Sequence, residues 1–286
     1  MKRYRDIVGD GGSNIVGQVE AQQARLGARL REVRAIIAIV SGKGGVGKSS
    51  ITANLAGAFA LAGARVGVLD ADLNGPSMAT MLGVRGRTLT VGPAGVEPPA
   101  GALGIGVMSM DLLLAGDATP LTWDAPSQAA AHTWRGTMEA NALREFLADT
   151  VWGALDVLLL DLPPGTDRLA TITGMVPALA GTVIVTIPSD VSRLIVRKSI
   201  TVALAGPAPV LGVIENMAGM FPGPGAEVLA HDSGVPFLGR VPFDPALAVA
   251  ADRGEPYVAV SPESAAARAL TSIADRLREA LPAARS

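Results

Sequence analysis

The sequence predicts a doubly wound α/β fold, with a mainly parallel β-sheet and helices on both of its faces. Continuous apolar runs, as expected of parallel strands that are buried on both sides, occur at residues 36–40, 65–69, 157–160, 182–187 and 210–214. Segments with helical spacing lie between these runs, among them residues 48–62, 137–150 and 191–204. Strands that alternate with helices along the chain form one sheet covered on both faces.

Composition agrees with helices packed closely on a buried sheet. Hydrophobic residues make up 49% of the 286 residues and aromatic residues only 3%, so small aliphatic side chains dominate the core. The chain contains no run of 18 or more apolar residues, which predicts no membrane-spanning helix. The first residues are not followed by the apolar stretch of a signal peptide, so we expect a cytoplasmic protein.

Charge and cysteine content exclude several classes of function. The net charge of −2 gives no support for general attraction to nucleic acid. The chain has no cysteine, so it forms no disulfide and offers no thiolate to a metal. With only two histidines, a zinc site built on histidine is not expected either.

The chain divides into an N-terminal arm, residues 1–34, and one domain at residues 35–286. Within the arm, residues 18–34 have the spacing of a helix, with Leu26, Leu30 and Val33 on one stripe. The general behaviour of chain termini favours a surface helix or a loosely held arm. Inside the domain, residues 84–104 are rich in Gly and Pro and predict an excursion, and residues 218–227 predict a second loop.

A glycine-rich loop between the first strand and the next helix predicts a phosphate-binding site. Residues 42–49 read Gly-Lys-Gly-Gly-Val-Gly-Lys-Ser, which matches the Walker A pattern in its required context. Glycines let the backbone wrap a polyphosphate with its N–H groups pointing inward, and the helix N-terminus adds partial positive charge. Lys48 would neutralise the β- and γ-phosphates, and the hydroxyl of Ser49 can bind Mg²⁺.

A second lysine makes this loop more specific. Lys43 directly follows the first glycine, and a long cation there cannot easily fold back while Lys48 occupies the same region. Lys43 can instead reach the phosphates bound to a second subunit, as an arginine finger does. The loop therefore predicts a nucleotide switch that acts as a homodimer.

At this point the chain resembles a known family. The loop 42–49 is similar to the deviant Walker A of the MinD/ParA/Mrp group of dimerising ATPases. Further blocks resemble the Mrp (ApbC) branch, and the resemblance extends over about residues 35–280. These blocks are residues 70–77 (Asp-Ala-Asp-Leu-Asn-Gly-Pro-Ser), 134–136 (Trp-Arg-Gly), 161–166 (Asp-Leu-Pro-Pro-Gly-Thr) and 215–217 (Glu-Asn-Met).

The resemblance implies a magnesium-dependent ATPase and assigns roles to particular residues. Mg²⁺ would be held by Ser49 and Asp161, with Asp70 supporting the metal shell, and Asp72 would orient the attacking water. The switch at residues 163–166 would sense the γ-phosphate. The catalytic residues are then Lys43, Lys48 and Asp72. Asn216 would bind the adenine edge, and residues 242–245 would form the other wall of the base pocket. The expected ATP-binding residues are Gly42, Gly44, Gly45, Val46, Gly47, Lys48, Ser49, Ser50, Asn216, Pro242 and Asp244.

The chain departs from the family at the residues that carry its cargo. Mrp proteins are similar to iron–sulfur cluster carriers, in which a Cys-x-x-Cys pair after the Glu-Asn-Met block helps to bridge a [4Fe–4S] cluster between two subunits. Here the block is followed by Ala-Gly-Met-Phe-Pro-Gly-Pro-Gly. We therefore expect no iron–sulfur cluster on this chain's own residues. Asp167 also follows Thr166 directly, where the family usually places a glycine between the threonine and the aspartate.

Three functions remain open at this stage. The first is a slow, partner-stimulated Mrp-type ATPase that serves cluster assembly, or another client, through an unidentified protein partner. The second is a MinD-like switch on a membrane surface, for which the C-terminal helix would present Ala266, Leu270, Ile273, Leu277 and Leu281. The third is a ParA-like partition ATPase that contacts DNA through Arg193, Arg197 and Lys198 or through Arg25, Arg29 and Arg34. Mixed charge on the C-terminal helix and the absence of net positive charge argue against membrane and nucleic-acid partners.

Overall fold

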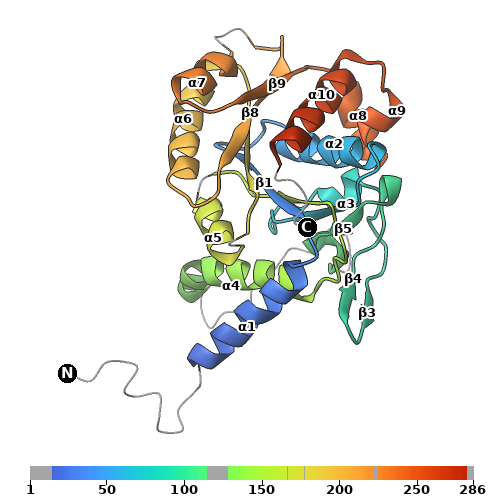
Figure 1. The fold of residues 1–286 in the computed structure, drawn as a ribbon, viewed down its shortest axis with the longest axis vertical. Helices are drawn as coiled ribbons and strands as arrows, with labels where there is room; N and C mark the ends of the chain where they lie inside the picture. The colour runs from blue at the N-terminus through green and yellow to red at the C-terminus, as the bar shows by residue number, and fades with distance from the viewer. Residues whose placement is uncertain (1–14, 115–127, 166, 177, 222–224, 282–286) are drawn as a thin grey trace, which may run out of the picture.

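The computed structural model describes residues 15–114, 128–165, 167–176, 178–221 and 225–281. Among these residues, seven parallel strands form the central sheet in the order β5-β2-β6-β1-β7-β8-β9 (Figure 1). The predicted doubly wound fold is thereby confirmed. The strands of this sheet are β1 (Ala35–Ser41), β2 (Val66–Asp70), β5 (Gly106–Met108), β6 (Val157–Asp161), β7 (Gly181–Thr186), β8 (Val210–Ala218) and β9 (Phe237–Pro242).

The α-helices fall between the strands, as the alternation predicted. Their bounds are α1 (Ile15–Leu30), α2 (Lys48–Leu61), α3 (Met78–Met81), α4 (Gln128–Asp149), α5 (Asp167–Met175), α6 (Asp190–Leu204), α7 (Ala226–Asp232), α8 (Ala246–Asp252), α9 (Tyr257–Val260) and α10 (Ala265–Ala280). Helix α4 begins well before the predicted residue 137. Gly136 lies inside this helix, although glycine is an unfavourable helix former.

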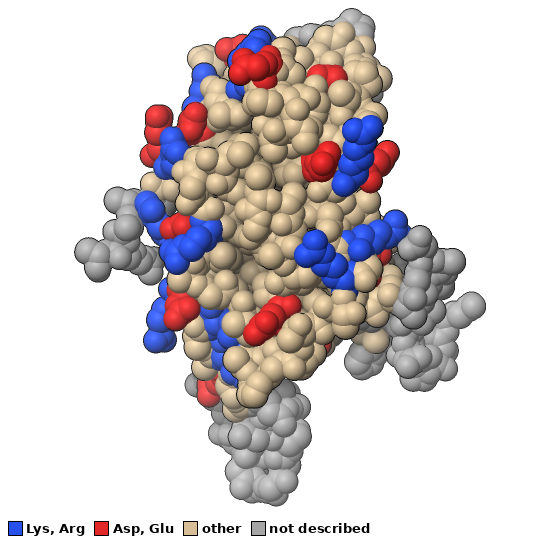
Figure 2. Space-filling view, turned by 90° about the vertical axis from the view of Figure 1, so that its right-hand side faces the viewer, with Lys and Arg blue, Asp and Glu red and all other residues tan. Residues whose placement is uncertain are grey.

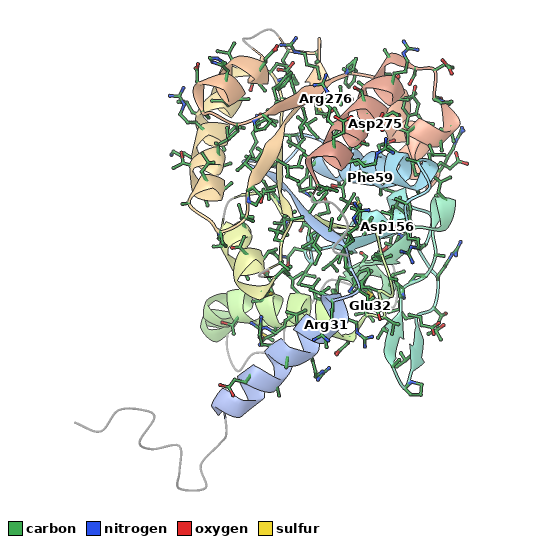
Figure 3. All side chains as sticks on the ribbon, viewed as in Figure 1. Arg31, Glu32, Phe59, Asp156, Asp275 and Arg276 are labelled. Atoms are coloured by element: carbon green, nitrogen blue, oxygen red, sulfur yellow. The ribbon has the colours of Figure 1, made fainter. Side chains whose placement is uncertain are left out.

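Two apolar layers cover the sheet (Figure 1). Helices α2, α3, α8, α9 and α10 pack on one face, and Phe59 of α2 lies in this layer at 2% exposure (Figure 3). Helices α1, α4, α5, α6 and α7 pack on the other face, where Leu147 and Ile172 are fully buried. Burial of these two apolar layers provides the main stabilisation of the sheet.

Helix α1 is held by α4 rather than loosely attached. Leu26 is 1% exposed and belongs to the core layer that α4 helps to form. Arg29 donates from Nε to the carbonyl oxygen of Ala148 over 3.0 Å, and Arg25 forms an ion pair with Asp149. Residues 31–34 are a turn outside the helix, so the predicted helical end at residue 34 is four residues too far. The division of the chain at residue 34 stays a prediction.

The C-terminal helix keeps its apolar face inside the protein. Leu270 and Leu277 of α10 are fully buried in the same core layer as α2, and Arg276, labelled in Figure 3, donates to the carbonyl oxygen of Leu238 over 2.9 Å. The face that a membrane-surface helix would need is therefore already covered. No helix within the described parts of the chain is long and apolar enough to cross a bilayer.

The predicted excursion at residues 84–104 contains a small antiparallel hairpin, β3 (Thr90–Gly92) and β4 (Gly95–Glu97). Two short 3-10 helices flank β5: η2 (Ala102–Gly104) and η3 (Met110–Leu112). The excursion returns the chain to the sheet edge at β5, which pairs with β2.

The parallel sheet gathers the functional motifs at one edge. Strands β2 and β6 are neighbours, and their register sets Asp70 directly beside Asp161. Strand β1 lies on the other side of β6 and ends where the glycine loop begins. Carboxyl ends of parallel strands in such sheets are the usual place for a ligand.

Candidate nucleotide-binding site

The glycine loop wraps tightly between β1 and α2. Gly45 and Gly47 have φ values of 76° and 77°, a region that side chains with a Cβ rarely adopt. A Cβ on Gly47 would lie 2.3 Å from Nδ2 of Asn216, and one on Gly42 would lie 2.6 Å from Cγ2 of Ile195. Glycine at these two positions therefore lets β8 and α6 approach the loop.

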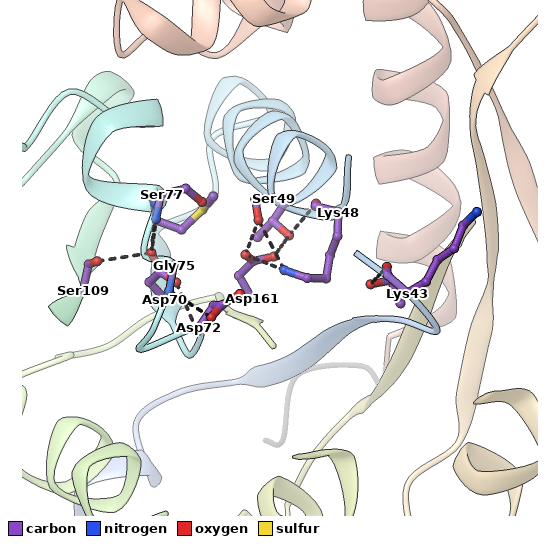
Figure 4. Close-up of polar contacts among 12 residues, drawn as sticks. Lys43, Lys48, Ser49, Asp70, Asp72, Gly75, Ser77, Ser109 and Asp161 are labelled. Atoms are coloured by element: carbon purple, nitrogen blue, oxygen red, sulfur yellow. Dashed lines mark hydrogen bonds and ion pairs between the residues drawn. The ribbon is translucent and has the colours of Figure 1, made fainter. Parts of the chain in front are cut away.

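Asp161 contacts three polar side chains at the end of this loop and near the start of α2 (Figure 4). Nζ of Lys48 lies 2.7 Å from its Oδ2, and the hydroxyl of Ser49 donates to the same oxygen over 2.6 Å. The hydroxyl of Thr52 donates to Oδ1 over 2.6 Å. Asp161 has no exposed surface and Lys48 is 6% exposed, so the two charges compensate one another in a buried setting.

These residues fit a magnesium–phosphate site. A serine hydroxyl and a carboxylate are the hard oxygen ligands that Mg²⁺ prefers, and Ser49 and Asp161 already meet at the N-terminus of α2. The helix dipole and the backbone N–H groups of the loop favour a polyphosphate at this point. When a nucleotide is bound, the ammonium group of Lys48 would turn from Asp161 to the phosphates, because the carboxylate and the phosphates compete for it.

Asp70 occupies the neighbouring strand end and organises the loop that follows it. Its Oδ2 accepts from the backbone N–H groups of Ser77 (2.8 Å) and Met78 (2.9 Å) and from the hydroxyl of Ser109 (3.2 Å). Its Oδ1 accepts from the N–H of Asp72 over 3.2 Å. With both oxygens used in this way, Asp70 is better placed to support a metal shell than to bind the ion directly.

Burial controls the protonation of Asp70. Loss of hydration raises the pKa of its carboxyl from 3.8 to about 7, and the nearby charge of Asp161 adds to the increase. The N–H groups of Met78 and Ser77 and the charge of Lys48 oppose it.

This shift predicts a pH dependence of folding for the nucleotide-free protein. Between pH 3.8 and about 7 the folded chain keeps a proton on Asp70 that the unfolded chain has lost. The contribution of Asp70 to the free energy of unfolding therefore falls as pH rises through this window. Urea unfolding of the parent and of Asp70→Asn from pH 5 to 8 measures it, and the variant should lose part of the slope. The surface variant Asp156→Asn is the matched control, because contact with Arg65 lowers the pKa of Asp156. Equal slopes in the parent and Asp70→Asn would refute the expectation.

Asp72 lines a cavity of about 390 Å³ between the loop that follows β2 and helix α4. The N–H of Gly75 donates to Oδ1 of Asp72 over 3.2 Å, and the side chain is half-buried. Pro163 and Pro164 of the predicted switch line the same cavity. The structure thus brings together the residue expected to orient water and the loop expected to sense the γ-phosphate, of which Thr166 lies outside the described residues.

Lys43 points in the opposite direction from Lys48. Figure 4 shows its side chain extending away from Asp161, whereas the side chain of Lys48 turns towards it. Its backbone is fixed because its carbonyl oxygen accepts from the hydroxyl of Ser41 over 3.0 Å. The side chain of Lys43 makes no hydrogen bond or ion pair with other residues that the structure describes. A role of Lys43 towards a second subunit stays a prediction.

The residues expected to surround the base lie at the ends of β8 and β9. Asn216 is 6% exposed and donates from Nδ2 to the carbonyl oxygen of Val46 over 2.9 Å, so it braces the glycine loop. Pro242 pairs with Ala218 at the end of the sheet. Asp244 accepts from the N–H of Ala246 at the start of α8 (3.0 Å) and from the hydroxyl of Tyr257 (2.7 Å). A role of these residues towards adenine stays a prediction.

Sequence reasoning overlooked three polar residues that the structure places around the site. Thr52 lies one helical turn after Lys48, and that spacing could have identified it. Ser109 directly follows β5, and the rule that ligands gather at strand ends could have found it too. Glu139, which lines the cavity beside Asp72, gave no signal because it comes from the middle of a helix.

Fold and site together define a P-loop NTPase with the topology of the MinD/ParA group. A profile of the ParA family described as NUBPL iron-transfer P-loop NTPase matches residues 32–278, and the chain belongs to this family. It is therefore a P-loop NTPase of the Mrp/NUBPL iron–sulfur cluster carrier type, as the sequence motifs predicted.

Curated relatives cover most of the chain. An iron–sulfur cluster carrier protein of Saccharolobus solfataricus is 42% identical over 272 residues, which span 91% of this chain and 88% of the relative. The human cytosolic Fe–S cluster assembly factor NUBP2 is 40% identical over 270 residues, 89% of this chain and 96% of that protein.

Solved structures show the same fold. A nucleotide-binding protein of Archaeoglobus fulgidus in complex with ADP is 35% identical, with a TM-score of 0.67 over 82% of this chain and 92% of its own. The cell division ATPase MinD of Pyrococcus furiosus is 26% identical, with a TM-score of 0.62 over 86% of this chain and 99% of its own.

Proposed function

We propose that this chain is a dimeric Mg-ATP switch that serves iron–sulfur cluster assembly without holding a cluster on its own side chains. The observation that carries the proposal is the convergence of Lys48, Ser49 and Thr52 on Asp161 in a chain that has no cysteine. The first feature supports ATP binding. The lack of cysteine indicates that the chain does not itself hold the iron–sulfur cluster that the names of its relatives describe.

The residues divide the work of phosphoryl transfer. Lys48 and the inward N–H groups of the glycine loop stabilise charge on the β- and γ-phosphates. Ser49 and Asp161 would hold Mg²⁺, which would neutralise phosphate charge when bound. Asp72, beside its cavity, orients the attacking water by accepting a hydrogen bond from it, and can take up its proton as the water attacks. Lys43 of a second copy reaches the γ-phosphate and stabilises the charge that develops as the bond to the leaving group breaks.

Without thiolates, the chain lacks the usual ligands of an iron–sulfur cluster. Within the described residues, no group of three or more His, Cys, Asp or Glu side chains could hold a metal ion. Glycine and proline, which dominate the loop after Met217, have no ligand atoms in their side chains. The chain therefore acts as a partner or regulator that passes its nucleotide state to an unidentified protein. By analogy with the name of the human relative, we place it in the cytoplasm.

Neither the face of α10 nor Arg25 and Arg29 supports an alternative function, whereas Arg197 and Lys198 of α6 are exposed and keep the DNA hypothesis open to test. The apolar face of α10 is packed in the core, which removes the surface that a membrane switch would use. Arg25 and Arg29 are engaged with Asp149 and with backbone carbonyls. On the face in Figure 2, blue and red side chains are interleaved, so this face shows no basic field suited to DNA.

Trapping the ATP-bound state tests the proposal. Asp72→Ala should bind Mg-ATP and accumulate as a dimer, because hydrolysis no longer resets the switch, and light scattering after size exclusion measures the mass. With ADP the variant should be monomeric. Asp252→Ala, which removes an exposed acid on α8, is the control and should behave as the parent. A variant that binds ATP and yet stays monomeric would contradict the dimeric switch. The trapped dimer is also the bait with which to capture the client.

A further inference from the structure

A buried carboxylate on α4 takes no part in the functions assigned above. Glu139 is 3% exposed, and its Oε1 accepts from Nδ2 of Asn74 over 2.9 Å, across 65 residues of sequence. A carboxylate is costly to bury unless it is hydrogen-bonded, and a hydrogen bond to a charged acceptor is stronger than a neutral one. The contact therefore links α4 firmly to the loop that follows β2.

That loop is the one that carries Asp72. Asn74 comes two residues after Asp72, and Leu73 between them is 3% exposed, so the loop is pinned at its centre. The N–H of Gly75 donates back to Asp72, which closes the turn around this carboxylate. A shift of Asn74 would consequently displace Asp72 through a short and tightly bonded segment.

Helix α4 is a stable platform for this contact. Leu143, one turn after Glu139, is 1% exposed and belongs to the core layer beneath the sheet. Glu139, Leu143 and Asp72 line the same cavity of about 390 Å³, whose remaining wall includes Pro163 and Pro164. Glu139 thus lies where α4, the Asp72 loop and the switch loop meet.

We propose that Glu139 is a positioning residue for ATP hydrolysis, which holds Asp72 in place through Asn74. The inference rests on the proposed function, because it assigns Asp72 to the attacking water. It goes further by making the geometry of Asp72 depend on α4, a helix that contributes Glu139 and Leu143 to the cavity beside Asp72.

The test compares Glu139→Ala, Glu139→Gln, Asn74→Ala and the double variant Glu139→Ala/Asn74→Ala. Loss of the contact should lower kcat roughly 10- to 100-fold, because small displacements of a catalytic group have effects of this size. The Kd for Mg-ATP should stay within about twofold, since the phosphate loop is untouched. Glu139→Gln should recover most of kcat, because its Oε1 still accepts from Asn74. In the double variant, Glu139→Ala should lower kcat by a smaller factor than it does in the parent, because the two residues act through a shared contact.

Hydrogen exchange gives a second readout that does not depend on turnover. Amides of residues 71–77 should exchange faster in Glu139→Ala than in the parent, whereas Glu145→Ala, an exposed change on the same helix, should alter neither exchange nor kcat. If the parent chain binds ATP but does not hydrolyse it, the proposed function is wrong. Hydrogen exchange of residues 71–77 would then decide by itself whether Glu139 holds the loop in place. Unchanged exchange in Glu139→Ala would overturn the inference. So would faster exchange with an unchanged kcat, or additive effects in the double variant.

Discussion

Lys43→Ala should lower the ATP turnover of the chain about 10³-fold, the lower end of the effect of a cation supplied to phosphoryl transfer by a second subunit. The Kd for Mg-ATP should change less than about threefold, because a group that acts only in the transition state lowers kcat without weakening ground-state binding. The structure motivates this split, since Lys43 extends away from Asp161 while Lys48 contacts it (Figure 4). Phosphate release gives kcat, and titration with a fluorescent ATP analogue gives Kd.

Lys198→Ala is the matched control for that experiment. Lys198 is an exposed lysine on α6, and its removal changes the net charge by the same amount. It should leave both kcat and Kd as in the parent. Equal losses of affinity and turnover in Lys43→Ala would show that Lys43 binds nucleotide within its own subunit, contrary to a role in trans.

Lys48→Ala should weaken Mg-ATP binding about 100-fold, because a hydrogen bond to a charged group contributes about 1.5–3 kcal/mol and each 1.4 kcal/mol is a factor of ten. The nucleotide-free protein should also lose about 3 kcal/mol of stability, since the change leaves the buried carboxylate of Asp161 without its cation. The hydroxyls of Ser49 and Thr52 still donate to that carboxylate and limit the loss. Calorimetric titration and urea unfolding measure the two effects.

A second substitution separates binding from stability. Lys48→Ala/Asp161→Asn removes the uncompensated charge and should recover much of the stability, but not the affinity for Mg-ATP. If the affinity for Mg-ATP recovered together with the stability, Lys48 would act through folding rather than on the phosphates. Unchanged affinity in Lys48→Ala alone would remove the basis for ATP binding at this loop.

The sequence predicted the sheet because strands and helices follow local patterns, and the same patterns placed the residues of the expected phosphate site at one edge of that sheet. Apolar runs located the central strands, and the rule that parallel strands end at one edge predicts that Asp70 and Asp161 lie close together. The register confirms this juxtaposition. The predicted helix began at residue 137, directly after Gly136, whereas α4 begins at Gln128, so the low helix propensity of glycine does not end the helix here.

Contacts between distant segments set the limit of prediction. Glu139 meets Asn74 across 65 residues, and no local pattern of α4 indicates a polar residue facing inwards. Asp244 was expected at the base pocket from family resemblance, but its bonds to Tyr257 and to the N-terminus of α8 appear only once the C-terminal helices are packed. Tertiary structure rather than sequence spacing determines such partners.

The central claim separates the nucleotide switch from the cluster, and anaerobic reconstitution tests it most directly. The purified chain, shown to bind Mg-ATP, is incubated with ferrous iron and sulfide, treated with a chelator, desalted, and measured for iron, sulfide and cluster absorbance. The account predicts intact ATP binding and no stoichiometric cluster, because the chain contains no cysteine. A chelator-resistant [4Fe–4S] cluster in stoichiometric amount would contradict it.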